Sequence, residues 1–267
     1  LLDKTRVILR NTSSGKNVKK GGCDDYYHAS YVKISDHLNF ICAQGPLVNT
    51  IEDFWFMVIQ EDSKVIVQLC QWNEDGKVQC AEYFPKDEEE WKEYGAIRVQ
   101  VVEKTEPMKQ LRKVYRTKIR AVYKNKDHEV LHLLYGGWPD HFVAESTPVC
   151  REVRALALKL CEKKPAVIHC SAGIGRTGTF AAISMAVDRL KHTDSLSVPD
   201  VVKELRDQRM HAVQNDQQYL FIYRMVIEIL LAEDLLLKNA DIISFIKEYD
   251  DLVARKRQEK TRKGKSK

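Results

Sequence analysis

The sequence has no pair of cysteines at the spacing of a zinc site and no even set that suits a disulfide framework. Its seven cysteines are an odd number, and none lies three positions from another. Structural zinc sites and small disulfide-rich domains depend on such spacings. We therefore expect a protein of a reducing compartment that holds no metal ion.

Long apolar runs are also missing. The longest, residues 219–237, is interrupted by the charged residues Arg224, Glu228, Glu233 and Asp234. A transmembrane helix needs about 20 consecutive, mainly apolar residues, so this stretch is excluded as a span. No signal peptide is visible, and the chain begins at Leu1 rather than Met. We expect an upstream part, which leaves open a membrane anchor outside this sequence.

Excess charge of one sign is confined to the end of the chain. The formal net charge is +5, but residues 254–267 alone hold eight Lys or Arg against one Glu, so the remainder is close to neutral. A near-neutral body does not favour nucleic-acid binding. We expect residues 1–253 to form a single domain and residues 254–267 a basic, disordered tail. A role of this tail at an acidic membrane or in nuclear import stays open.

No repeat or low-complexity linker divides the 267 residues, of which 44% are hydrophobic and 30% charged. The first half is rich in strand-like apolar or alternating runs, at 65–70, 97–102, 111–123 and 129–135. Helical spacing and start signals dominate later, with helices expected after Ser146 and at 177–190, 199–208, 216–232 and 240–253. This order predicts an α/β (α+β) domain with a central mixed, twisted β-sheet flanked by helices.

One stretch, Val167–Phe180 (VIHCSAGIGRTGTF), joins a short apolar strand to a helix through a loop of small residues. Gly and Ala let backbone N–H groups turn inward, and the helix N-terminus adds partial positive charge, as in a phosphate cradle. The loop lacks the lysine of the nucleotide-binding G-x-x-x-x-G-K-[ST] pattern. Instead, Cys170 opens the loop and Arg176 closes it six positions later.

Cys170 and Arg176 together predict attack on phosphorus. A cysteine at a helix N-terminus, ringed by amide donors and near an arginine, is held as the nucleophilic thiolate. The rigid guanidinium of Arg176 matches two phosphate oxygens. A buried structural cysteine beside an unrelated arginine would explain an isolated C-x5-R pattern equally well. The whole strand–loop–helix string favours the phosphate site.

The string HCSAGIGRTG, residues 169–178, resembles the signature of the tyrosine-specific protein tyrosine phosphatases. Other segments extend the resemblance over nearly the entire chain, in family order: DYYHASYV (25–32), QGPLVNTIEDFW (44–55), VQCAEYFP (78–85), WPD (138–140) and VQNDQQY (213–219). The resemblance implies that family's fold and hydrolysis of phosphotyrosine in proteins through a phosphocysteine, without a cofactor. It also implies phosphotyrosine-containing proteins as partners of a monomeric domain, either cytoplasmic or the cytoplasmic portion of a larger protein.

The resemblance further implies roles for single residues. Asp140, on a mobile loop that begins near Trp138, would protonate the leaving tyrosine oxygen and then deprotonate the hydrolytic water. Gln214 would position that water, with Gln218 beside it. Thr177 would steady the leaving thiolate, Glu74 would orient Arg176, and His169 would hydrogen-bond rather than transfer protons. Phosphate would be held by Ser171, Ala172, Gly173, Ile174, Gly175 and Arg176.

Several residues depart from the family pattern near this site. Phe142 stands where glycine is expected and Ala144 where proline is expected; His211 replaces a glycine and Gln79 a lysine. If position 142 requires a positive φ, Phe142 is strained and loop closure is altered. The family's substrate-stacking loop is expected upstream of Leu1. Two alternatives therefore stay open: a phosphotyrosine-binding pseudophosphatase with weak or no turnover, and a non-catalytic adaptor docked by its basic tail.

Overall fold

The apolar and alternating runs of the chain assemble into one nine-stranded mixed sheet. The computed structural model describes residues 2–10, 25–88, 90–193 and 195–265, so Cys23 lies outside the described residues. In spatial order the strands are β1 (Arg6–Ile8), β2 (Tyr26–Ser35), β3 (Leu38–Ala43), β11 (Ala166–His169), β4 (Val65–Gln68), β10 (Lys126–Tyr135), β9 (Val114–Tyr123), β8 (Ile97–Pro107) and β7 (Trp91–Tyr94). A separate hairpin pairs β5 (Asn73–Glu74) with β6 (Lys77–Val78).

Strand β11 lies at the centre of the sheet and runs parallel to both of its neighbours, β3 and β4. All four of its residues are buried, which is why it reads as a short run without alternation. Binding sites in sheets of this kind form beyond the carboxyl ends of parallel strands. The topology therefore delivers Cys170, the residue after β11, to the edge where such sites occur.

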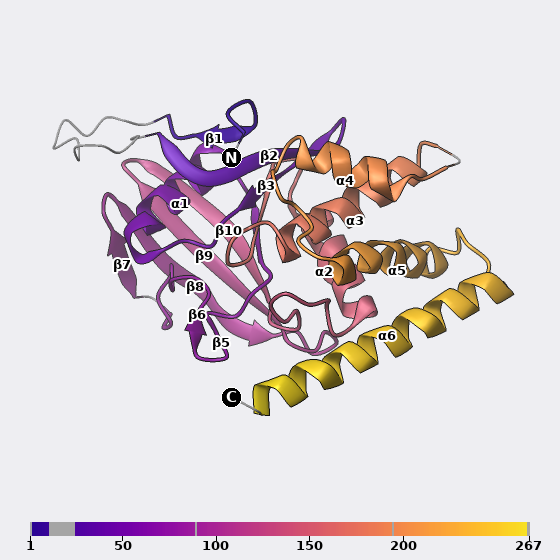
Figure 1. The fold of residues 1–267 in the computed structure, drawn as a ribbon. Coiled ribbons are helices and arrows are strands. Elements are labelled where there is room, and N and C mark those ends of the chain that lie inside the picture. The colour runs from indigo at the N-terminus through magenta and orange to yellow at the C-terminus, as the bar shows by residue number, and fades with distance from the viewer. Residues whose placement is uncertain (1, 11–24, 89, 194, 266–267) are drawn as a thin grey trace.

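Helices cover both faces of the sheet (Figure 1). On one face, α1 (Ile51–Gln60), preceded by a 3-10 turn (Val48–Thr50), packs on β2, β8 and β9. A large hydrophobic core includes residues of the remaining helices and extends to Tyr249 on the last of them. These helices are α2 (Thr147–Leu160), α3 (Arg176–Leu190), α4 (Val198–Arg206), α5 (Asp216–Ala232) and α6 (Ala240–Lys265). Within the described residues no helix is both long and apolar enough to cross a bilayer.

Polar caps fix where three of these helices begin. The side chains of Ser146, Ser197 and Asn215 each accept a hydrogen bond from an amide in the first turn of α2, α4 and α5. Such caps satisfy amides that have no partner inside the helix. The cap at Asn215 also sets the direction in which α5 leaves the candidate site.

The mixed sheet flanked by helices confirms the expected fold class, but two features differ from expectation. The sequence analysis did not identify β1, β2, β3 or β7. The expected boundary at residue 253 falls inside a helix, because α6 continues to Lys265. Arg, Lys, Gln and Glu are good helix formers, and Lys256 pairs with Glu259 one turn on, so the basic segment extends the helix. Within residues 254–265, the expected disordered tail is therefore helical.

Candidate active site

The loop between β11 and α3, residues 170–175, is here termed the cysteine loop; all its carbonyl groups accept hydrogen bonds. For the carbonyls of residues 170 to 175 in turn, the donors are His169 Nδ1 (3.2 Å), Gly45 N (2.9 Å), Arg209 Nη2 (3.4 Å), Arg209 Nε (3.1 Å), Gly178 N (3.2 Å) and Thr179 N (2.9 Å). In a trans peptide the N–H lies opposite the preceding carbonyl, so this arrangement turns the amides of residues 171–176 the other way. They ring the start of α3.

One of the inward amides contacts the sulfur of Cys170. The amide of Gly173 lies 3.3 Å from Cys170 Sγ and donates to it. Within the described residues, the amides of Ser171, Ala172, Ile174 and Gly175 donate to no protein atom. A ring of amide donors at a helix N-terminus is a site for an anion with several oxygens. Cys170 is buried, with 3% of its surface exposed.

Glycine is required at two positions of the cysteine loop. Gly173 has a φ of +69°, and a Cβ there would lie 2.0 Å from the carbonyl oxygen of Ala43 on β3. At Gly175 a Cβ would lie 2.2 Å from Gln214 Oε1. The first glycine permits the turn, and the second lets the Gln214 side chain approach the loop backbone.

Arg176 is buried at the first position of α3 and is held from several directions. Its Nη1 donates to Glu74 Oε1 at 2.6 Å and to the carbonyl of Trp138 at 3.0 Å. Its Nη2 lies 3.1 Å from Asp140 Oδ1 and 3.4 Å from Gln79 Oε1. Burial acts to lower the pKa of Arg176, but the neighbouring Cys170 and Glu74 act in the opposite direction and outweigh it, so the pKa is raised.

One donor of Arg176 remains available. Its Nε is buried and has no hydrogen-bond partner among the described residues. A buried N–H without a partner costs free energy, so an oxyanion that accepts from it is favoured at this place. The hydroxyl of Thr177 is likewise buried and without a partner. It makes no hydrogen bond to Cys170 Sγ in this structure, and its expected role toward the leaving thiolate stays a prediction.

Residues 138–145, here called the acid loop, lie against the cysteine loop and carry Asp140. Besides the Trp138 carbonyl, the carbonyls of Asp140, His141 and Phe142 accept from donors outside the acid loop. These donors are Lys260 Nζ (3.0 Å), Asn215 Nδ2 (3.3 Å) and Gln218 Nε2 (3.5 Å). The loop is thus fixed with the Asp140 carboxylate beside Arg176, and this carboxylate remains about one-third exposed.

Phe142, which departs from the family pattern, does not have the positive φ that the sequence analysis considered for it. The residue with positive φ in the acid loop is His141, at +53°, and not Phe142. Phe142 is buried, and its carbonyl also accepts from the Trp138 indole N–H at 2.9 Å. The expected strain at position 142 is therefore absent. His211 does adopt a left-handed φ of +63°, the conformation that its expected glycine would favour.

Gln214 and Gln218 lie next to each other at the start of α5. Gln214 is exposed, whereas Gln218 is fully buried and accepts from the Gln214 amide at 3.0 Å. The side chain of Gln214 reaches over Gly175 of the cysteine loop. The structure thus brings these glutamines, Cys170 and Asp140 to one place, although they are far apart in the sequence.

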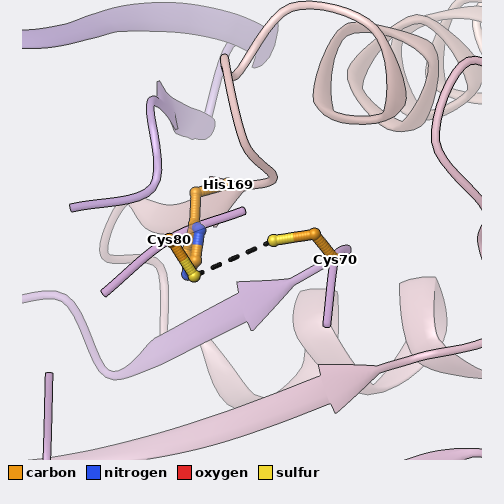
Figure 2. A group of neighbouring side chains, drawn as sticks. All are labelled: Cys70, Cys80 and His169. Carbon is orange, nitrogen blue, oxygen red and sulfur yellow. Dashed lines mark hydrogen bonds between the residues drawn. The ribbon is translucent and has the colours of Figure 1, made fainter. Parts of the chain in front are cut away.

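Beneath the cysteine loop, Cys70, Cys80 and His169 form a buried cluster whose ligand-type atoms lie within 4.8 Å of one another (Figure 2). Its chemistry does not suit a metal ion. Both ring nitrogens of His169 are already bonded, to the Cys170 carbonyl and to the Tyr83 hydroxyl at 2.9 Å. The hydrogen bond with Cys80 and burial raise the pKa of the Cys70 thiol well above its ordinary value, so it stays protonated.

The same environment keeps His169 neutral. Burial lowers the pKa of His169 to about 4, although its bond to the Cys170 carbonyl acts in the opposite direction. A neutral His169 donates through Nδ1 to the loop carbonyl, and its Nε2 contacts the Tyr83 hydroxyl. It therefore supports the backbone that carries the sulfur, and no proton transfer is assigned to it.

Arg209 is a supporting residue that the sequence analysis missed. It is buried, and besides the loop carbonyls it contacts Ser30 Oγ (3.2 Å) and the His28 carbonyl (3.3 Å) on β2. It follows α4, and its partners lie between 36 and 181 positions away in the chain. No local pattern could reveal it. Asn215 was also missed, although its place three residues before Gln218 fits a helix cap.

The chain was compared with known proteins. A family model of the protein-tyrosine phosphatase domain matches residues 1–228. The tyrosine-protein phosphatase Lar-like of Caenorhabditis elegans is 35% identical over 229 residues, 85% of this chain and 10% of its own length. The non-receptor type 20 phosphatase of Rattus norvegicus is 33% identical over 238 residues, 85% of this chain and 52% of its own. The human non-receptor type 7 phosphatase is 35% identical over 230 residues, 83% and 62% of the respective chains.

The chain thus spans less than two thirds of the length of these relatives. A solved structure from work on the "PTPN18 fingerprint on distinct HER2 tyrosine phosphorylation sites" is also similar. It superposes with a TM-score of 0.75 at 28% identity and covers 86% of this chain and 80% of that chain. The likeness therefore covers the mixed sheet and the helices around it.

Replacement of Arg209 by lysine should weaken binding of inorganic phosphate about tenfold, because lysine cannot bridge two loop carbonyls and β2 together. Isothermal titration with phosphate measures this effect. Arg189→Lys, a change on the outer side of α3, is the matched control and should bind as the unchanged protein does. Equal affinity in Arg209→Lys would show that the loop keeps its shape without this arginine.

The buried histidines should make the protein less stable in mild acid. Burial lowers the pKa of His169 to about 4 and that of His132 to about 3, so between these values and about 6.5 only the unfolded chain takes up their protons. Each should remove about 2 kcal/mol of unfolding free energy between pH 7.5 and 5.0. Urea unfolding of His132→Gln should show a smaller loss. The exposed His37→Gln is the control and should lose as much unfolding free energy between these pH values as the unchanged protein does. An equally large loss in His132→Gln would contradict this account.

Proposed function

This chain belongs to the protein-tyrosine phosphatase family, and we propose that it is an active enzyme that hydrolyses phosphotyrosine in proteins through a phosphocysteine on Cys170. The observation that carries the proposal is the set of outward carbonyls around the cysteine loop. It leaves inward amides and the unpartnered Nε of Arg176 beside one sulfur. A phosphoryl group bound there would be held by its oxygens and attacked at phosphorus.

In the first half of the proposed reaction, the Cys170 thiolate attacks phosphorus. The S–P bond forms and the bond from phosphorus to the tyrosine oxygen breaks. Asp140 supplies the proton that the leaving tyrosine oxygen needs. Its place on the acid loop supports this role, because Arg176 lies 3.1 Å from its carboxylate and spans both loops.

In the second half, water attacks phosphorus and the S–P bond breaks. The Asp140 carboxylate takes the proton from that water, which restores its acid form. Gln214 reaches over Gly175 from outside the cysteine loop, and this placement supports a role in orienting the water. Developing negative charge on the phosphoryl oxygens would meet the loop amides and Arg176, which are already in position.

The geometry of the acid loop favours an enzyme over a binding module without turnover. The substitution of Phe142 for glycine introduces no left-handed residue at that position, and Asp140 lies beside Arg176. A measurement of phosphate release distinguishes the enzyme from the pseudophosphatase alternative. Tight binding of a phosphotyrosine peptide with no release of phosphate would establish it.

We further propose action on phosphotyrosine proteins in the cytoplasm, by a monomeric domain or as the cytoplasmic portion of a larger protein. All six cysteines that the structure describes are free thiols, and the mechanism needs a reduced Cys170.

Replacement of Cys170 by serine should abolish hydrolysis of an aryl phosphate in the presence of a metal chelator, because serine is not ionised in this cradle. Binding of inorganic phosphate should persist. Cys161→Ser is the matched control, since this buried thiol caps the end of α2 by donating to Leu158. Residual turnover by Cys170→Ser at the rate of the control would contradict the assignment of the nucleophile.

Replacement of Asp140 by alanine should slow hydrolysis of a phosphotyrosine peptide by about 10²- to 10⁴-fold, the usual contribution of a general acid. Peptide affinity should be retained. The exposed Asp36→Ala in the turn between β2 and β3 serves as the control. A steady-state rate for Asp140→Ala equal to that of the unchanged protein would show that another group supplies the proton.

A further inference from the structure

Helix α6 lies beside the acid loop and contacts it near its basic end. Lys260 Nζ donates at 3.0 Å to the backbone carbonyl of Asp140, the residue whose carboxylate is assigned as the acid. One turn earlier on the same helix, the guanidinium carbon of Arg257 lies 5.7 Å from the centre of the Phe142 ring. Two cationic side chains of one helix thus contact Asp140 and Phe142, which lie two positions apart in the loop.

A second connection joins α6 to the beginning of the acid loop. The Trp138 ring packs edge-on against Phe221 of α5, with centroids 5.4 Å apart. Phe221 in turn stacks on Tyr249 of α6 at 6.5 Å, and Tyr249 is buried. Asp250, the next residue of α6, lies 3.8 Å from Arg224 of α5. The helix is therefore anchored on α5, and its basic end is not an isolated extension.

Between α6 and the end of the acid loop lies a cavity of about 390 Å³. Its walls are residues 143–148 on one side and α6 residues that include Val253, Ala254 and Arg257 on the other. The acid loop is thus bonded to α6 at its middle and separated from it by open space beyond. This arrangement leaves room for the loop to move while Lys260 stays with the helix.

We propose that Lys260 and Arg257 are positioning residues that hold the acid loop in the place where Asp140 reaches the reacting phosphoryl group. The proposal rests on the proposed function. A substrate tyrosine enters past this loop, and outward movement of Asp140 from Arg176 also takes its carbonyl away from Lys260. The two α6 contacts then favour the arrangement with the acid in position.

The residues that depart from the family pattern fit this role. Phe142 stands where the family has glycine, and its ring is the surface that Arg257 covers. A glycine at this position would offer α6 no side chain. The helical basic segment and the aromatic residue of the loop therefore form one contact.

The size of the effect follows from the kind of contact. A hydrogen bond from an exposed ammonium and a cation–π contact near the surface are each modest. Loss of the Lys260 bond should change the ratio of the two loop positions about three- to tenfold. Such a change lowers kcat/KM, since the acid is in place for a smaller fraction of bound substrate.

The test is Lys260→Met, which removes the charge and the donor from an exposed site. Steady-state kinetics are measured on a phosphotyrosine peptide and on p-nitrophenyl phosphate. Tyrosine, with a pKa of about 10, needs a proton to leave, whereas p-nitrophenolate is much less basic. We expect kcat/KM, which reports the steps up to release of the leaving group, to fall about three- to tenfold for the peptide and less than twofold for p-nitrophenyl phosphate.

Arg255→Met is the matched control, because Arg255 is on the same helix but lines the separate groove beside Leu220. It should leave both substrates unaffected. Equal loss on both substrates in Lys260→Met would indicate general destabilisation, and no loss on either would also overturn the proposal. Failure of the proposed function has another signature, since the unchanged protein would then show no Cys170-dependent turnover at all.

Discussion

The site depends on the direction of six carbonyl groups. A peptide unit cannot rotate its carbonyl outward without turning the following amide inward, so the donors that bind the cysteine loop from outside determine what its interior offers. Two of those donors come from distant parts of the chain, the backbone of Gly45 and the side chain of Arg209. The others are the adjacent His169 imidazole and the first turn of α3. A sulfur placed in that interior has anion-binding groups as its nearest neighbours.

The strands, the buried cluster beneath the loop and Arg176 each support this arrangement. The parallel strands around β11 bring Cys170 to the carboxyl edge of the sheet, and the buried cluster beneath it keeps His169 neutral and fixed. Arg176 then joins the cysteine loop to the acid loop and to Glu74 on the β5–β6 hairpin. Because one buried guanidinium contacts three segments, a shift of any one of them alters the place of the others.

Helix α6 makes further contacts that support the site from outside the core. Its aromatic residues pack on α5, and its basic end contacts the outer side of the acid loop. The charged segment, which looks like a solvated tail when only its composition is considered, thus has specific partners. This also explains why a phenylalanine is accommodated in the acid loop of this chain.

The sequence by itself predicted the kind of chemistry and the family to which the chain belongs. The unbroken string from Val167 to Phe180 placed a strand, an amide-rich loop, a cysteine and an arginine in consecutive order, and local geometry suffices to relate them. The helices and strands β4, β8, β9, β10 and β11 could also be predicted, from caps, periodicity or short apolar runs, whereas β1, β2, β3 and β7 were not identified. Only the tertiary structure decided which distant groups hold that string in shape. Arg209 and Lys260 act on partners more than thirty and more than one hundred positions away, and such contacts leave no periodic trace in the chain. The conformation of Phe142 and the helical state of residues 254–265 likewise depended on packing that no local pattern records.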